Sequence, residues 1–176
     1  MNEDRSQVYK NRKYEIVSYN PKWPESFLFY AEKIRKIFGN VIIEHIGSTA
    51  IPGMSGKSCI DLLVELEEIS IVDSHVGEME KAGFIYSGQF VMENSRLFRV
   101  MDGQTLLANI HFFPIGHSHC TEMIGFRDYF RNHPEEVVVY SNLKNTLYAK
   151  YPDDYASYRK YKDVYVKSLN ERIKYD

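Results

Sequence analysis

The sequence of 176 residues contains few cysteines and no long apolar run. Two cysteines, Cys59 and Cys120, are too few for the disulfide framework of a secreted scaffold, which favours a reducing compartment. No run approaches the roughly 20 apolar residues that span a membrane, and the charged first residues have no signal-peptide core. A net charge of −2 creates no basic field that would attract nucleic acid or acidic membranes. We therefore expect a cytoplasmic protein that binds no membrane and carries no strong nucleic-acid signal.

The composition of the chain is typical of one globular domain. Hydrophobic residues make up 44% and charged residues 26%, and the chain is long enough to bury a core without staples. We predict a single domain over residues 1–176, with residues 1–13 loosely ordered and residues 118–176 forming a helical part of it. Before that part, apolar spacing predicts a helix, two strands, a helix and three strands. This order indicates an α+β fold, a sheet with packed helices.

Residues 45–65 form the stretch around which the chain is organised. An apolar strand stops at Gly47 and Ser48, and a second apolar strand carries one carboxylate, Asp61. A strand that changes to glycine and hydroxyl residues exposes backbone N–H groups, which suits an anion such as phosphate. Lys57 adds a cation to the loop, and Asp61 needs a partner if it is buried. The alternative is a tight turn that requires glycine and is capped by Asp61.

Gly56, Lys57 and Ser58 match the end of a phosphate-binding P-loop pattern. That pattern requires glycine where this chain has Ile51, and it requires a helix after the serine. The residues after Ser58 have the composition of a strand, so we reject the P-loop.

Three side chains around this loop are candidates for metal binding or proton transfer. A two-metal transferase needs a second carboxylate two residues after Asp61, but Leu63 occupies that position, and Glu65 lies roughly 13 Å further along. His111, in an apolar strand, is a candidate metal ligand or general base if that strand neighbours Asp61. The alternative is a hydrogen-bonded core histidine. His45, two residues before Gly47, is a third metal candidate.

Other charged or metal-binding side chains allow two interpretations each. His117, His119 and Cys120 have the composition of a metal cluster but lack partners at zinc-finger spacing, so we predict a loop. Lys162 lies in the middle of a tyrosine-rich face of the last helix. It either directs its ammonium toward the phosphate site or extends past the tyrosines into water. Arg99, in the middle of a strand, poses the same choice.

Six motifs are spread over residues 14–170 of the chain. They are Tyr19-Asn20-Pro21 with Trp23, residues 45–54 (HIGSTAIPGM), Lys57 with Asp61, Asn109-Ile110-His111, residues 126–130 (FRDYF), and Tyr158 with Lys162. Together they resemble the GrpB family, also called UPF0157, of the nucleotidyltransferase-like superfamily. Ser58 departs from the family pattern, in which a proline is usual after the lysine.

The resemblance implies a nucleotidyltransferase-like mixed β-sheet with packed helices and a C-terminal helical part. It further implies that Gly47 and Ser48 hold a nucleotide phosphate and that Asp61 binds a divalent metal, Mg²⁺ or Mn²⁺. The chain is also similar to a domain fused behind dephospho-CoA kinase, which points to nucleotide or coenzyme A chemistry. The family shares the missing second carboxylate at Leu63.

Three hypotheses follow for function. The first is nucleotidyl transfer, in which Asp61 and His111 hold Mg²⁺ or Mn²⁺ or act on the acceptor. The residues expected to hold phosphate are Gly47, Ser48, Lys57, Arg99 and Lys162. The second hypothesis, favoured by Leu63, is a nucleotide- or CoA-binding module without turnover. The third is a structural partner domain without a pocket. For both ligand-binding hypotheses, we expect Asp61 and His111 to face one cavity with the Gly-Ser turn at its rim.

Overall fold

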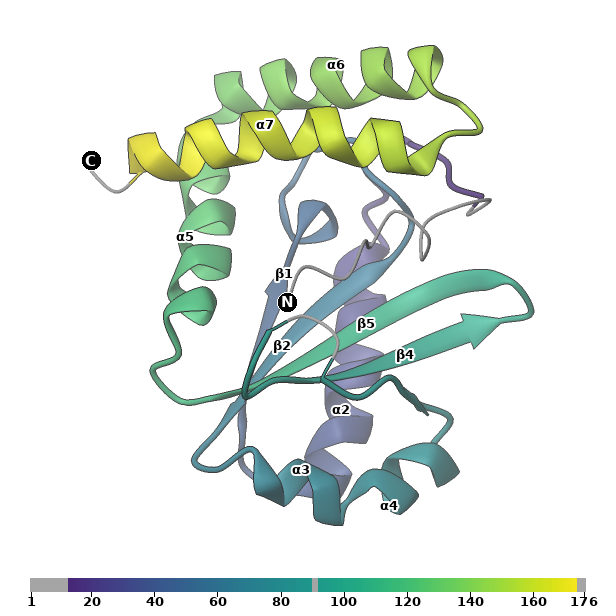
Figure 1. Ribbon diagram of the computed structural model, residues 1–176, viewed down its shortest axis with the longest axis vertical. Coiled ribbons are helices and arrows are strands. Elements are labelled where there is room, and N and C mark those ends of the chain that lie inside the picture. The colour runs from purple at the N-terminus through teal and green to yellow at the C-terminus, as the bar shows by residue number, and fades with distance from the viewer. Residues whose placement is uncertain (1–12, 90–91, 174–176) are drawn as a thin grey trace.

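The computed structural model describes residues 13–89 and 92–173, and its secondary structure is drawn in Figure 1. In chain order the elements are α2 Trp23–Phe38, β1 Ile42–Ile46, the short 3-10 turn η1 Ser48–Ala50, β2 Ile60–Leu66, α3 Ser70–Ser74, α4 Val76–Lys81, β3 Ile85–Tyr86, β4 Arg96–Asp102, β5 Thr105–Pro114, α5 Ser118–Asn132, α6 Pro134–Lys150 and α7 Tyr155–Ile173. Residues 1–13 are predicted to be loosely ordered, and residues 1–12 of that segment lie outside the described part.

The five strands form one mixed sheet in the order β1-β2-β5-β4-β3. The central pair, β2 and β5, is parallel, and the other neighbours are antiparallel. Parallel pairing brings Asp61 opposite Asn109 and Leu63 opposite His111. The predicted α+β fold with a mixed sheet and packed helices is confirmed.

One face of the sheet packs against α2, which crosses behind the strands in Figure 1. Alternate β2 residues, Leu62 and Val64, are fully buried there together with Ala31 and Ile34 of α2. Strand side chains alternate between faces, so the residues between them point the other way. This alternation decides which polar residues of β2 and β5 can reach the site.

The opposite face of the sheet carries Asp61 and packs against α5. Leu63 is fully buried in this layer with Ile46, Phe113 and Cys120. Position 63, where a two-metal site would have its second carboxylate, is therefore part of the core and not of an open polar surface.

The helices α5, α6 and α7 form a second apolar cluster, in which Phe130, Tyr140 and Leu169 are buried together with Ile51 and Met54 of the loop after η1. Figure 1 shows α6 and α7 lying side by side across one end of the sheet. Tyr14 connects the N-terminal segment to this layer, because its hydroxyl donates a hydrogen bond to the Tyr151 carbonyl. None of the described helices combines the length and apolarity that a membrane span requires.

Three local details refine the predicted order of elements. The helix predicted between the second and third strands is divided into α3 and α4 at His75. The last helix, α7, begins at Tyr155, because Asp154 accepts a hydrogen bond from the Ser157 N–H and caps the first turn. The loop expected at residues 117–120 is the first turn of α5, whose N-cap is His117.

Candidate functional site

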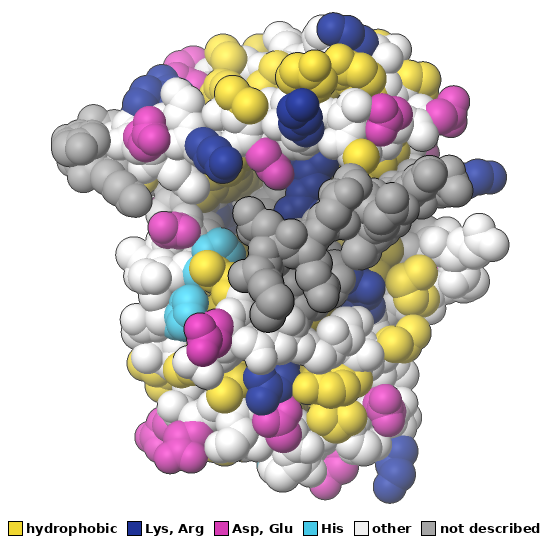
Figure 2. Space-filling view, in the orientation of Figure 1, with side chains coloured by type: hydrophobic (Ala, Val, Ile, Leu, Met, Phe, Trp, Pro, Cys, Tyr) yellow, Lys and Arg dark blue, Asp and Glu magenta, His cyan; other side chains and the backbone are white. Residues whose placement is uncertain are grey.

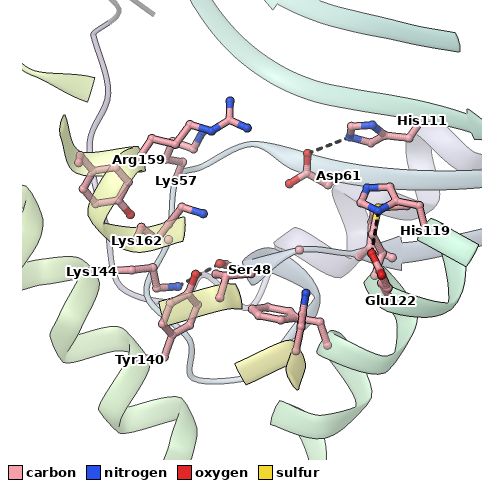
Figure 3. A pocket seen from close by; sticks show the side chains of 18 of the residues that line it. Ser48, Lys57, Asp61, His111, His119, Glu122, Tyr140, Lys144, Arg159 and Lys162 are labelled. Atoms are coloured by element: carbon pink, nitrogen blue, oxygen red, sulfur yellow. Dashed lines mark hydrogen bonds and ion pairs between the residues drawn. The ribbon is translucent and has the colours of Figure 1, made fainter. Parts of the chain in front are cut away.

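A cavity of about 370 Å³ lies between the Asp61 face of the sheet and the helices α5, α6 and α7. Figure 2 shows basic and histidine side chains gathered around a hollow between the helices above and the sheet below. Figure 3 shows the basic side chains on one side of the cavity and Asp61, His111, His119 and Glu122 on the other. The lining thus has a cationic end and an end with carboxylates and imidazoles.

The Gly-Ser turn lies at the rim of this cavity because it follows β1 directly. Gly47 has φ +73°, and a Cβ atom built on it would lie 2.7 Å from Asp61 Oδ2. Gly56, across the loop, has the same kind of close contact, since its Cβ would lie 2.7 Å from Ser48 Cβ. The two glycines therefore allow the loop to pack directly on Asp61 and Ser48.

Asp61 is held by two neighbours on β5. Asn109 donates a hydrogen bond of 2.8 Å to Asp61 Oδ1, and His111 Nε2 lies 3.7 Å from the same oxygen. Burial alone would raise the pKa of Asp61, but His111, the Asn109 amide and the charge of Lys57 together lower it. Asp61 is therefore a carboxylate, and the 3.7 Å between its Oδ1 and His111 Nε2 is within the about 4.4 Å that two donor atoms at about 2.0–2.2 Å from one metal can span.

His111 has one unsatisfied ring nitrogen. Its Nδ1 is buried and has no hydrogen-bond partner within the described part of the chain. An unpartnered N–H costs more than an unpartnered lone pair, because it loses a strong donor interaction with water. The arrangement therefore favours the tautomer in which Nε2 carries the proton and faces Asp61.

Three of the predicted phosphate-binding residues besides Gly47 line the cavity: Ser48, Lys57 and Lys162. Lys57 Nζ donates a hydrogen bond of 2.7 Å to the Tyr155 hydroxyl. Lys162 has a carboxylate partner, Asp163, at 2.8 Å, and this carboxylate also accepts from Arg159 at 3.2 Å. Lys162 thus reaches the cavity as predicted, but it is an ion-paired lysine and not an isolated ammonium.

Lys144 is a site residue that the sequence interpretation missed. Its side chain is only 2% exposed, and its Nζ lies 3.0 Å from Ser48 Oγ and also donates to the Ser55 carbonyl. The Tyr140 ring lies 4.4 Å from the same nitrogen. Burial, and then the charge of Lys162, lower the pKa of Lys144 to about 7.

The signal for Lys144 was present in the helical spacing of α6. Val137, Tyr140, Lys144 and Leu147 recur at intervals of three and four, which places them on one buried face. A lysine in the middle of such a face is the same anomaly that drew attention to Lys162. Tyr140, Leu143 and Leu147 also share an apolar side of this helix, and an interpretation that rests on these three residues alone omits Lys144.

The structure corrects two predicted site residues. His45 points to the α2 face of the sheet, where its ring stacks on Phe27 at 4.7 Å and Nε2 lies 3.0 Å from Thr49 Oγ1. Burial lowers the pKa of His45 to about 4, so this core imidazole is neutral and does not face Asp61. Arg99 lies on the Asp61 face but does not line the cavity, because β5 separates its strand from β2.

Two arginines of α5 contact β1 and the turn that follows it. Arg127 is buried and pairs with Glu44 of β1 and with Asp128, and it also donates to the His45 carbonyl at 3.1 Å. Arg131 donates to the Ala50 carbonyl at 3.0 and 2.8 Å. Both arginines therefore fasten α5 to the strand and turn that carry Gly47 and Ser48.

The implied Mg²⁺ or Mn²⁺ would need several carboxylate or other oxygen ligands around one point. Within residues 13–89 and 92–173, no group of three or more His, Cys, Asp or Glu side chains is arranged to hold a metal ion. The second carboxylate of a two-metal site is replaced by the fully buried Leu63. His119 and Glu122 line the cavity, but their side chains pair with each other at 3.2 Å. These residues do not fit a two-metal centre.

Comparisons with known proteins agree with the fold and the motifs. The family model described as GrpB protein matches residues 13–172. The UPF0157 protein YqkA of Bacillus subtilis (strain 168) is 35% identical over 169 residues, which cover 95% of this chain and 49% of that protein. The chain thus spans about half the length of this relative.

Solved structures extend the comparison to the fold. The crystal structure of the conserved protein GrpB from Enterococcus faecalis has a TM-score of 0.84 at 30% identity, covering 90% of this chain and 96% of that one. A crystal structure of the Cid1 poly(U) polymerase has a TM-score of 0.52 at 11% identity, covering 77% of this chain and 44% of that one. The second likeness shows a nucleotidyltransferase fold and nothing about activity. The chain belongs to the GrpB family.

Proposed function

We propose that this protein binds a phosphate-bearing small molecule of the nucleotide class, with a phosphate seated at the Gly-Ser turn. One observation carries the proposal: basic side chains from three separate elements converge on the Ser48 end of one cavity. They are Lys57 of the loop, Lys144 of α6, and Arg159 and Lys162 of α7. Asp163 supplies one carboxylate beside Arg159 and Lys162, and a bound anion would reduce the remaining repulsion among these like charges in a partly dehydrated space.

The size and lining of the cavity also support this ligand class. A volume of about 370 Å³ lies near the lower end of the range for small-molecule sites. Apolar and aromatic residues, among them Met123 and Phe126, complete the lining beside the polar groups. A nucleotide combines a phosphate with an apolar ring in this way, whereas an entire CoA molecule would extend beyond the cavity.

Nucleotidyl transfer is the second candidate function, and the Asp61–His111 pair favours it. Of this pair, Asp61 is the group that could take a proton from an acceptor hydroxyl or amine, because Nε2 of His111 carries a proton and Nδ1 is buried. Leu63 argues against the two-metal form of this chemistry, so we derive no step that depends on Mg²⁺ or Mn²⁺. A cytoplasmic location belongs to the same proposal, since a reducing compartment keeps the buried thiols of Cys59 and Cys120 reduced.

A thermal-shift and calorimetry screen tests the proposal. Purified protein is titrated with AMP, ATP and CoA, each with and without Mg²⁺ or Mn²⁺. A ligand at a hundred times its Kd should stabilise the native state by about 2.7 kcal/mol, a shift that melting detects readily. If none of these ligands stabilises the protein and none gives a heat of binding, the proposed function is overturned. A requirement for metal together with release of pyrophosphate from ATP would favour transfer over binding alone.

Lys57→Met should weaken nucleotide binding about tenfold or more, because a charge-assisted contact to phosphate contributes about 1.5–3 kcal/mol. Its effect on the melting temperature should be small, since Lys57 is only partly buried and bonds to one tyrosine hydroxyl. Lys36→Met is the matched control, because Lys36 is a surface lysine 72% exposed on α2. Unchanged affinity with a large loss of stability in Lys57→Met would instead assign the lysine to the structural turn.

A further inference from the structure

Lys144 is the most buried cation of the cavity, and it has no carboxylate partner among the residues that the structure describes. Asp163 pairs with Arg159 and Lys162, and Asp61 faces His111 and Asn109. The Lys144 side chain is 2% exposed, so water does not compensate for a missing counter-charge. An ammonium at this position is therefore costly in the empty protein.

The hydrogen bonds of Lys144 suit a neutral amine. An amine has two N–H groups and one lone pair, and Nζ contacts two oxygen atoms, the Ser55 carbonyl and Ser48 Oγ. The carbonyl can only accept, whereas the serine hydroxyl can either accept or donate. Protonation adds a third N–H. The Tyr140 ring lies 4.4 Å from Nζ, but residues 13–89 and 92–173 offer this N–H no further oxygen acceptor.

The charged and titratable groups around this end of the cavity come from every neighbouring element. They are Lys57 of the loop, Asp61 of β2, Tyr140 of α6, and Tyr155, Tyr158, Arg159, Lys162 and Asp163 of α7. Three of these, Lys57, Arg159 and Lys162, are cations, and the two carboxylates already have partners. An added phosphate dianion would therefore be the first anion available to Lys144.

We propose that Lys144 is a proton-coupled phosphate ligand, whose amine takes up one proton from the solvent as a phosphomonoester dianion enters the cavity. The proton goes from a buffer acid to the Nζ lone pair, and the new N–H donates to a phosphate oxygen. This inference rests on the proposed function and adds a substrate class to it. The site should prefer a terminal phosphomonoester, with two negative charges, to a phosphodiester or a carboxylate with one.

The preference follows from the charge that must be balanced. Lys57 and Lys162 already supply cations, and a monoanion is neutralised without protonation of Lys144. A dianion carries a second negative charge, which the ammonium of protonated Lys144 balances. The dianion therefore gains a charge-assisted hydrogen bond that a monoanion does not gain. With the pKa of Lys144 at about 7 in the empty protein, its amine is mostly neutral at pH 8 before binding.

Isothermal titration calorimetry with AMP at pH 8 measures this proton directly. AMP is already a dianion at this pH, because the second pKa of a phosphomonoester is near 6, so the ligand takes up no proton itself. The same titration in Tris and in HEPES gives different heats, since each buffer loses its proton with a different enthalpy. We expect close to one proton taken up per AMP bound.

Two variants and one ligand separate the outcomes. Lys144→Met should lose proton uptake and about tenfold or more in AMP affinity, while Lys150→Met, the same change on the exposed end of α6, should retain both. Cyclic AMP, a monoanionic phosphodiester of similar size, should bind the wild type more weakly than AMP and without proton uptake. In Lys144→Met the difference between the two ligands should shrink.

The results distinguish failure of this inference from failure of the proposed function. AMP binding with equal heats in both buffers would overturn the role of Lys144 and leave nucleotide binding intact. Proton uptake that persists in Lys144→Met would assign the proton to another group and also overturn it. Absence of binding by AMP and by ATP would overturn the proposed function and this inference together.

Discussion

Gly47→Ala should abolish nucleotide binding and lower the free energy of unfolding by several kcal/mol. The backbone of Gly47 has φ +73° and ψ −174°, a conformation that essentially only glycine adopts, at a cost of about 1–3 kcal/mol for other residues. The new methyl group would also lie 2.7 Å from Asp61 Oδ2, closer than a carbon and an oxygen can approach. Asp61 must then move away from Asn109, and the turn must move away from Lys144.

Gly39→Ala is the matched control for this variant. Gly39 ends α2 with the same φ of +73°, but a Cβ atom there meets no atom within 4 Å. It should therefore show the backbone cost without the collision and should bind nucleotide like the wild type. Chemical denaturation and calorimetry on both variants measure the two effects. Equal stability and equal affinity in the two variants would mean that the contact between the turn and Asp61 carries no function.

Leu63→Asp, which restores the second carboxylate of a two-metal site, should destabilise the protein instead of creating that site. Leu63 is fully buried with Ile46, Phe113 and Cys120, and a carboxylate in this apolar cluster loses its hydration. Loss of a core leucine alone costs about 2–5 kcal/mol, and the buried charge adds to that. At about 2–4 °C per kcal/mol, the melting temperature should fall by roughly 10 °C or more.

Leu63→Met provides the control, because it preserves the volume and the apolar character and should cost less than about 1.5 kcal/mol. Thermal melting with and without Mn²⁺ compares the two variants. A Leu63→Asp protein that melts like the wild type and is stabilised by Mn²⁺ would contradict this expectation. It would show that the face of the sheet can accept a metal centre, and it would revive the two-metal form of the transfer hypothesis.

The elements that the sequence predicted best are those with short-range signals. The strand, small-residue loop and strand around Gly47 follow from a change in composition within a few residues. The hairpin between β4 and β5 follows from Asp102-Gly103, a dipeptide that favours the tight turn found there. The adjacency of Asp61 and His111 was expected only as a consequence of the site, and the parallel pairing of β2 and β5 produces it.

The mistakes concern properties that depend on pairing between distant segments. His45 was assigned to the site because it lies two residues before Gly47. Which face it occupies is decided by the register of β1 on β2, where His45 pairs with Leu62 and Ile46 pairs with Asp61. A single strand shows that His45 and Ile46 point to opposite faces, but not which of the two faces Asp61.

The two lysines of the helical layer show a different limit. Lys162 was identified from its position on a tyrosine-rich face, yet its partner is the next residue, Asp163, which the same pattern did not consider. Lys144 lies on an equally apolar face and is far more buried. Helical spacing shows that a lysine faces the core, whereas its acceptors, Ser48 and Ser55, can be known only after α6 is docked on the loop.

The long chain separation between the Gly-Ser turn and Lys144 has a consequence for the order of events during synthesis. Ser48 and Lys144 are 96 residues apart, so the turn is made roughly 5–20 s before the lysine at about 5–20 residues per second. Contacts between distant residues also form late in folding, because closing a long loop costs entropy first. The emerging chain can therefore pair β1 with β2 while the proposed phosphate site is still incomplete. If the proposed function holds, a nucleotide in solution binds only the completed site and cannot guide the assembly of the sheet.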